Sequence, residues 1–70
     1  MNTPSTPTSR GTVFRVARQA AGVSVRSVAS RAGITHSTLS RWERGEREVA
    51  ENTYDALTQA LADLMNGAAA

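Results

Sequence analysis

Apolar residues recur at helical spacing in four stretches of the chain. In residues 12–21 the repeat is formed by Phe14, Ala17 and Ala21. Residues 24–32 and 35–44 are shorter stretches of the same kind, and no run alternates between apolar and polar residues as a strand does. Residues 50–66 hold the longest apolar stripe, which consists of Tyr54, Leu57, Leu61, Leu64 and Met65. The pattern predicts an all-α chain with a long C-terminal helix.

Residues suited to the ends of helices bound these stretches. Hydroxyl side chains that can cap a helix N-terminus stand at Thr12, Ser24 and Thr35. Glycines, which accept the left-handed conformation that often ends a helix, stand at Gly22, Gly33, Gly45 and Gly67. We therefore expect four separate helices joined by short turns.

The turn at residues 32–35, with the sequence AGIT, is the most informative connection. Ala32 is small enough for a neighbouring helix to approach, and Gly33 permits a positive φ. Ile34 is apolar and would fill the space under the turn, while Thr35 would cap the next helix. Two short helices joined by such a glycine turn are typical of the helix-turn-helix motif.

The helix predicted at 35–44 has two different faces. At about 100° per residue, Leu39 and Trp42 share the face that must lie on the core, with Glu43 beside it. Burial of an unpaired Glu43 would be costly, so a partner is expected, and Arg18 is the natural candidate; the alternative is a Glu43 that faces solvent. The outward face is polar and becomes cationic along the helix, with His36, Ser37, Ser40, Arg41 and Arg44.

Small polar side chains let a helix enter the DNA major groove, where arginine can reach guanine edges or phosphates. The alternative is an ordinary solvated helix face. The charge distribution favours DNA: residues 1–47 hold all eight arginines and two glutamates, a formal net charge of +6, whereas residues 48–70 carry −4. Such segregation indicates a basic surface for a polyanion.

Length and composition restrict the other classes of protein. With 70 residues, one domain is the upper limit, and its core is small. The chain has no cysteine and one histidine, so we expect no metal site and no cofactor. No apolar run is long enough to span a membrane or to act as a signal peptide. We expect a disordered arm at residues 1–10, a domain at 11–66 and a flexible tail at 67–70.

The segments RQAAGVS (18–24), VASRAGITHSTLSRWERGER (28–47) and TYDALTQAL (53–61) resemble the lambda-repressor-like helix-turn-helix family, also called the Cro or xenobiotic-response-element type. The resemblance covers most of the chain. It implies a compact bundle of four or five helices that binds operator DNA, usually as a two-fold dimer.

The resemblance also implies roles for individual residues. Contacts to DNA bases are expected from His36, Ser37, Ser40 and Arg41. Contacts to DNA phosphates are expected from Thr35, Arg44 and Arg47. Independently of the resemblance, the first N–H groups and the dipole of the second helix favour an anion, so Ser24 and Arg26 are further candidates for phosphate contacts; the alternative is that Arg26 only adds solubility. Arg18 and Glu43 match a family ion pair that ties the first helix to the third.

Three features depart from the family pattern, two single positions and one segment. Val25 stands where the family commonly has a glutamine that contacts phosphate, and Ser27 replaces the glutamate of a capping box. Residues 61–66 contain no break, so we expect the fourth helix to continue and to end the fold.

The sequence leaves two functions open. The first is a sequence-specific regulator of transcription, most simply a repressor that binds double-stranded DNA as a homodimer in the bacterial cytoplasm, encoded by a bacterium or a phage and associated with the nucleoid. The second is an antitoxin or adaptor that uses the same fold to bind a protein partner. Candidates for a dimer interface are Leu61, Leu64 and Met65. An enzyme is disfavoured because no carboxylate or cleft completes a site around His36 and Ser37.

Overall fold

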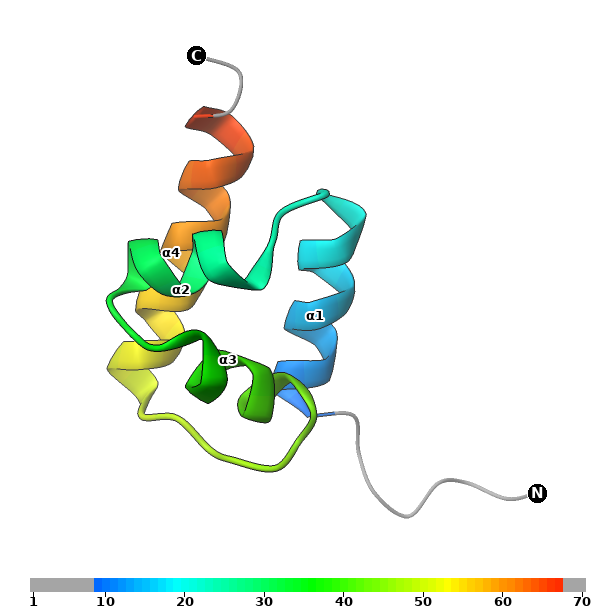
Figure 1. Ribbon diagram of the computed structural model, residues 1–70, viewed down its shortest axis with the longest axis vertical. Coiled ribbons are helices and arrows are strands. Elements are labelled where there is room, and N and C mark those ends of the chain that lie inside the picture. The colour runs from blue at the N-terminus through cyan, green and yellow to red at the C-terminus, as the bar shows by residue number, and fades with distance from the viewer. Residues whose placement is uncertain (1–8, 68–70) are drawn as a thin grey trace, which may run out of the picture.

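The computed structural model describes residues 9–67, and every regular element in that range is an α-helix. The helices are α1 (Arg10–Ala20), α2 (Val25–Ala32), α3 (His36–Glu43) and α4 (Glu51–Gly67). Helices α2 and α3 lie between α1 and α4, and α3 crosses below α2 (Figure 1). The main packing contacts join α2 to α4, α1 to α3 and α2 to α3. The expected all-α bundle with a long last helix is confirmed.

Three of the four helices begin at a side-chain cap. Ser24 Oγ accepts a hydrogen bond from the Ser27 N–H at 3.1 Å, and Thr35 Oγ1 accepts one from the Thr38 N–H at 3.2 Å, as the sequence predicts. The expectation for the first helix is wrong. Ser9, not Thr12, is the cap, because Ser9 Oγ accepts from the Thr12 N–H and so starts α1 at Arg10. Arg10 therefore belongs to the domain and not to the expected arm.

The expected glycine stops are found at three positions. Gly22, Gly33 and Gly45 have φ of +72°, +80° and +78°, and each follows the end of a helix. After each glycine, the next N–H reaches back to a carbonyl five residues earlier; for α2 this bond joins the Ile34 N–H to the Ala29 carbonyl at 3.0 Å. The fourth stop is different, because Gly67 is the last residue of α4 and not the residue beyond it.

The arm and the tail fall largely outside the described range. Residues 1–8 and 68–70 are not described, so the predictions for them lie outside the described residues. Helix α4 runs without a break through residues 61–66, as expected from the sequence. No fifth helix occurs in the described part of the chain.

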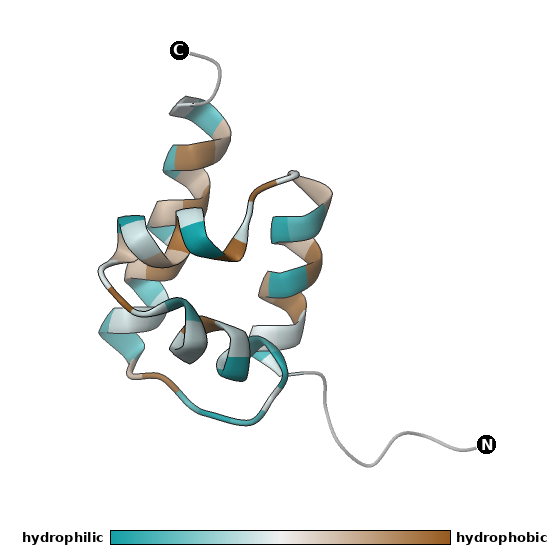
Figure 2. Ribbon diagram, viewed as in Figure 1, coloured by the Kyte–Doolittle hydropathy of each residue, from teal (hydrophilic) through white to brown (hydrophobic). Residues whose placement is uncertain are grey.

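The core draws on every helix. Its buried apolar members are Phe14, Val28, Ala29, Leu39, Trp42, Leu57, Ala60 and Leu61. The centroid of the Trp42 ring lies 5.3 Å from the ring centroid of Phe14 and 5.9 Å from that of Tyr54. The aromatic side chains of α1, α3 and α4 thus meet in one cluster. Polar residues are interspersed with apolar ones along the helices, as expected where each helix buries one face (Figure 2).

One expected interface residue is instead part of this core. Leu61 is only 7% exposed, so the expectation that it is available for a dimer contact is wrong. Leu64 is half-buried and packs against the core, whereas Met65 is 54% exposed. The apolar stripe of α4 thus serves mainly to hold the domain together.

Helices α1 and α3 approach so closely that only glycine fits at position 11. A Cβ on Gly11 would overlap the carbonyl oxygen of Trp42 and would lie 3.1 Å from Cα of Glu43. The close contact places the N-terminal half of α1 directly on the end of α3.

Candidate nucleic-acid interface

The structure divides α3 into a buried side and an exposed side. Leu39, Trp42 and Glu43 are at most 4% exposed and face the core. His36, Ser37 and Arg41 are exposed, and Ser40 is half-buried at the edge of the contact with α1. The helix thus turns only small polar or cationic side chains outward.

The exposed side chains of α3 meet in one open groove. It is lined by His36, Ser37, Ser40, Arg41 and Arg44. The first four are the residues expected to contact bases, and Arg44 follows the helix as its C-terminal cap. Among residues 9–67, Arg41 has no carboxylate within ion-pair distance, so its guanidinium is available for an acceptor on a ligand.

A buried ion pair fixes α3 on α1. Arg18 Nε donates to Glu43 Oε2 at 2.8 Å, and Arg18 Nη2 donates to Glu43 Oε1 at 2.9 Å. A third bond, from Arg18 Nη1 to the Val23 carbonyl at 2.8 Å, gives each of the three guanidinium nitrogens a hydrogen-bond partner. The side chains are 10% and 3% exposed, and the structure pairs Glu43 with the partner expected from the sequence. A bidentate pair of this kind sets both the distance and the orientation between two helices.

The two capping hydroxyls expected at phosphates are engaged within their own helices. Ser24 Oγ donates to Ser27 Oγ at 2.9 Å besides accepting from the Ser27 N–H. Thr35 Oγ1 does the same with the hydroxyl and N–H of Thr38. What α2 offers an anion is therefore its first backbone N–H groups and the exposed Arg26, while Val25 is half-buried against the core.

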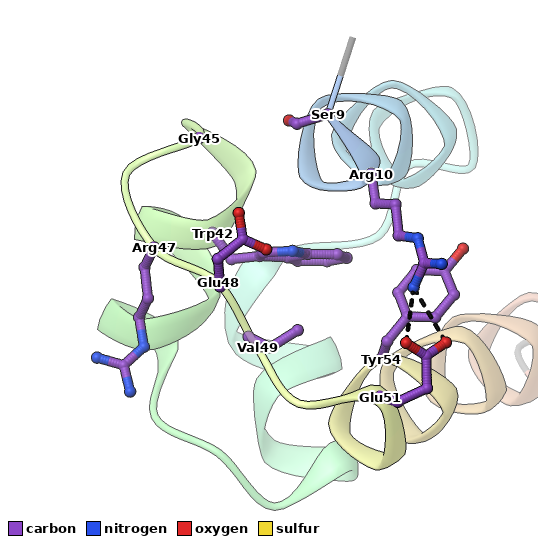
Figure 3. A pocket seen from close by; sticks show the side chains of 9 residues that line it. All are labelled: Ser9, Arg10, Trp42, Gly45, Arg47, Glu48, Val49, Glu51 and Tyr54. Carbon is purple, nitrogen blue, oxygen red and sulfur yellow. Dashed lines mark hydrogen bonds and ion pairs between the residues drawn. The ribbon is translucent and has the colours of Figure 1, made fainter. Parts of the chain in front are cut away.

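The arginines that follow α3 differ in their surroundings. Arg44 is paired with Glu46, with Nε 3.2 Å from Oε2, and both side chains are more than half exposed. Arg47 is exposed and, within the described residues, has no carboxylate at ion-pair distance. Its side chain extends away from the other labelled residues (Figure 3).

The same view shows contacts that local sequence patterns did not reveal. Arg10 donates from Nη1 to both Glu51 oxygens, at 3.2 and 3.1 Å, and its guanidinium lies over the Tyr54 ring, 4.5 Å from the centroid (Figure 3). This contact joins the start of α1 to the start of α4. The hollow beside it is lined by the carboxylates of Glu48 and Glu51 as well as by Arg10 and Arg47, so its formal charges balance and do not favour a phosphate.

The described residues 9–67 contain neither a metal-ligand cluster nor a membrane-spanning helix. No group of three His, Cys, Asp or Glu side chains there is placed to hold a metal ion. None of the described helices is long and apolar enough to cross a membrane.

Comparison with known proteins places this surface in a family. No curated protein and no solved structure gives a significant match. A family model described as a helix-turn-helix domain matches residues 11–62, a range that includes α1, α2, α3 and most of α4. In such domains the second helix of the motif lies in the DNA major groove, and here that helix is α3. The chain belongs to the helix-turn-helix family, in agreement with the lambda-repressor-like type of DNA-binding domain.

Proposed function

We propose that the protein is a sequence-specific regulator of transcription that binds double-stranded DNA through the exposed side of α3. The observation that supports this most strongly is the groove lined by His36, Ser37, Ser40, Arg41 and Arg44. Its side chains are short where the helix begins, so the helix can sink into the major groove. The cationic side chains follow further along the helix, within reach of guanine edges and of the backbone.

The residues of the groove divide into two roles. Arg41 points outward without a carboxylate partner in the described structure and reads a base edge, with Ser37 beside it. His36 and the half-buried Ser40 flank them. Arg44 lies beyond the helix and binds backbone phosphate, and Arg26 and Arg47 add further phosphate contacts from α2 and from the loop after α3.

The same proposal gives α2 a positioning role. Its first backbone N–H groups, at the cap formed by Ser24, suit an anion better than the Ser24 hydroxyl does, since that hydroxyl is hydrogen-bonded to Ser27. At the start of α3, the Thr35 hydroxyl is likewise bonded within the chain, to Thr38, so the first backbone N–H groups of α3 are the donors for an anion.

The regulator works as a repressor that occupies a palindromic operator as a homodimer. One short helix reads only a few base pairs, and two copies on half-sites about 34 Å apart raise the specificity. The exposed Met65, together with half-buried Leu64, remains the candidate contact on α4. A bacterial cytoplasm, where the nucleoid is accessible, is the compartment that fits this activity.

Selection of bound sequences from a random duplex pool identifies the operator. On that operator, Arg41→Ala is expected to cost about 1–3 kcal/mol and to relax the preference at one base pair. Arg44→Ala is expected to weaken operator and scrambled DNA alike. If the selection enriches no sequence, or if Arg41→Ala weakens both duplexes equally, the proposed reading role of α3 is wrong.

The second candidate function is that of an antitoxin or adaptor. It is favoured by the exposed apolar side chains Val13 and Val16 on α1 and Met65 on α4, which are 58%, 62% and 54% exposed. Affinity capture from the native host separates the two functions, because an adaptor retains a stoichiometric partner that is not a second copy of itself.

A further inference from the structure

We propose that the groove between α1 and α3 binds one phosphodiester of the DNA backbone, with Arg15 of α1 as a contact outside the helix-turn-helix motif. The proposal rests on the DNA-binding function above and extends the interface to a third helix. The groove is lined by residues of three helices and by the cap of α3: Arg15, Arg18, Gln19, Val25, Ser40, Glu43 and Arg44.

The packing of α1 on α3 places Arg15 at this groove. Gly11, Arg15 and Arg18 follow one another at four and three residues and so lie along one side of α1. Gly11 touches the end of α3 and Arg18 is bonded to Glu43, so Arg15 emerges between two fixed contacts. Arg15 thereby lines the groove together with Arg44.

The charges around the groove favour an anion. At its base, Glu43 is neutralised by Arg18, which binds both carboxylate oxygens. Arg15 has no carboxylate within ion-pair distance among residues 9–67, and Arg44 has only the exposed Glu46, which does not line the groove. Arg15 and Arg44 thus line one hollow in which the only lining carboxylate among the described residues, that of Glu43, is already paired.

The position and size of the groove fit a phosphate of bound DNA. It shares Ser40 and Arg44 with the groove on the outward side of α3, so the two hollows adjoin. In the proposed complex, a duplex held against α3 brings its backbone close to Arg15. The volume of about 180 Å³ exceeds the roughly 30 Å³ that one water occupies in the liquid, which leaves room for a phosphate group with some of its hydration. Gln19, also in the lining, supplies a neutral hydrogen-bond donor.

Arg15→Gln tests the assignment, and Arg31→Gln is the matched control. Arg31 is also an exposed helical arginine, but it is paired with Asp63 on α4 at 3.5 Å and does not line the groove. Both variants lose one positive charge. Arg15→Gln is expected to lower the affinity for operator and scrambled duplex by the same factor, roughly three- to tenfold. It should also reduce the slope of log K against log salt by about 0.9, the value of one phosphate contact.

Backbone substitution identifies the phosphate itself. A series of operator duplexes is prepared, each with one neutral methylphosphonate linkage. At the contacted position, the loss caused by Arg15→Gln should disappear, because the substitution has already removed the charge that Arg15 binds. If the Arg15→Gln loss persists on every duplex of the series, or if Arg15→Gln behaves like Arg31→Gln, the proposal is wrong.

Inorganic phosphate distinguishes a DNA site from a site for a free anion. In the absence of DNA and at constant ionic strength, replacing chloride by phosphate should raise the melting temperature of the wild type no more than that of Arg15→Gln. Selective stabilisation of the wild type by phosphate, together with equal DNA binding by the two proteins, would assign the groove to a free phosphate ion and overturn the DNA assignment. If the wild type binds no duplex, the proposed function itself fails, a result distinct from a wild type that binds DNA and an Arg15→Gln that binds equally well.

Discussion

Removal of the carboxylate of Glu43 tests how far the position of α3 depends on one ion pair. In Glu43→Ala, Arg18 loses two charge-assisted hydrogen bonds of 2.8 and 2.9 Å and keeps only the bond to the Val23 carbonyl. The Arg18 side chain is 10% exposed, so water reaches the abandoned guanidinium poorly. Loss of one member of such a buried pair costs on the order of 3 kcal/mol.

That cost is large for a chain of this size. At roughly 0.05–0.15 kcal/mol per residue, a folded domain of 70 residues has about 4–10 kcal/mol of stability. A loss of about 3 kcal/mol should lower the melting temperature by roughly 12–24 °C. Thermal and urea unfolding followed by circular dichroism measure both quantities.

The chain contains a matched control for this variant. Arg44 and Glu46 form an ion pair of the same residue types, at 3.2 Å, but their side chains are 55% and 56% exposed. Glu46→Ala should therefore change the free energy of unfolding by at most about 1 kcal/mol. If Glu43→Ala destabilises the protein no more than Glu46→Ala, burial does not determine the value of the pair, and the reasoning is refuted.

The double variant Arg18→Met with Glu43→Leu separates the charge effect from packing. It removes both charges and retains apolar volume, so it should recover much of the stability that Glu43→Ala loses. A double variant as unstable as Glu43→Ala would show that the lost stability comes from geometry and not from an unpaired charge.

Three further variants test separate contacts. Gly11→Ala should destabilise the fold by about 1–3 kcal/mol because the new Cβ overlaps the backbone of α3. A Cβ at Gly67 would meet nothing within 4 Å, so Gly67→Ala should not destabilise the fold, and chemical denaturation of both variants tests the difference. Ser24→Ala should cost about 1 kcal/mol of stability through its lost cap but leave the salt slope of DNA binding unchanged. Glu46→Gln should tighten binding to scrambled DNA more than Glu48→Gln does, because of the two only Glu46 is paired with an arginine of the proposed DNA interface. Equal gains in affinity for the two variants, measured by DNA titration, would contradict this.

Local signals were sufficient for most of the fold. The caps at Ser24 and Thr35 and the stops at Gly22, Gly33 and Gly45 depend on interactions within a few residues, so sequence spacing predicts them. Thr12 is a wrong prediction because Ser9, three residues earlier, is equally able to cap. Ser9 also supplies the carbonyl for the first helical bond, from the Val13 N–H at 3.1 Å.

Contacts between distant segments were harder to predict. The apolar stripe on α4 shows which residues share a face, but not which neighbour covers each of them, so it wrongly predicts an interface role for the buried Leu61. The contact of Arg10 with Glu51 joins residues 41 positions apart and has no local signal. Gly11 has an ordinary helical φ, so its role becomes visible only once α3 is placed against it.

The eight residues of α3 pack into the core and, in the proposed function, also contact DNA, and separate faces of the helix carry these two roles. Leu39 and Trp42 hold it in the core, and Glu43 fixes its C-terminal end through Arg18. Neither task uses the exposed side chains of His36 or Arg41, because exposed positions away from core contacts contribute little to stability. In the proposed DNA-binding role, recognition can therefore vary at these positions while the helix stays in place. Ser40 is the exception: it is half-buried beside α1, so a large residue there would disturb packing and recognition together.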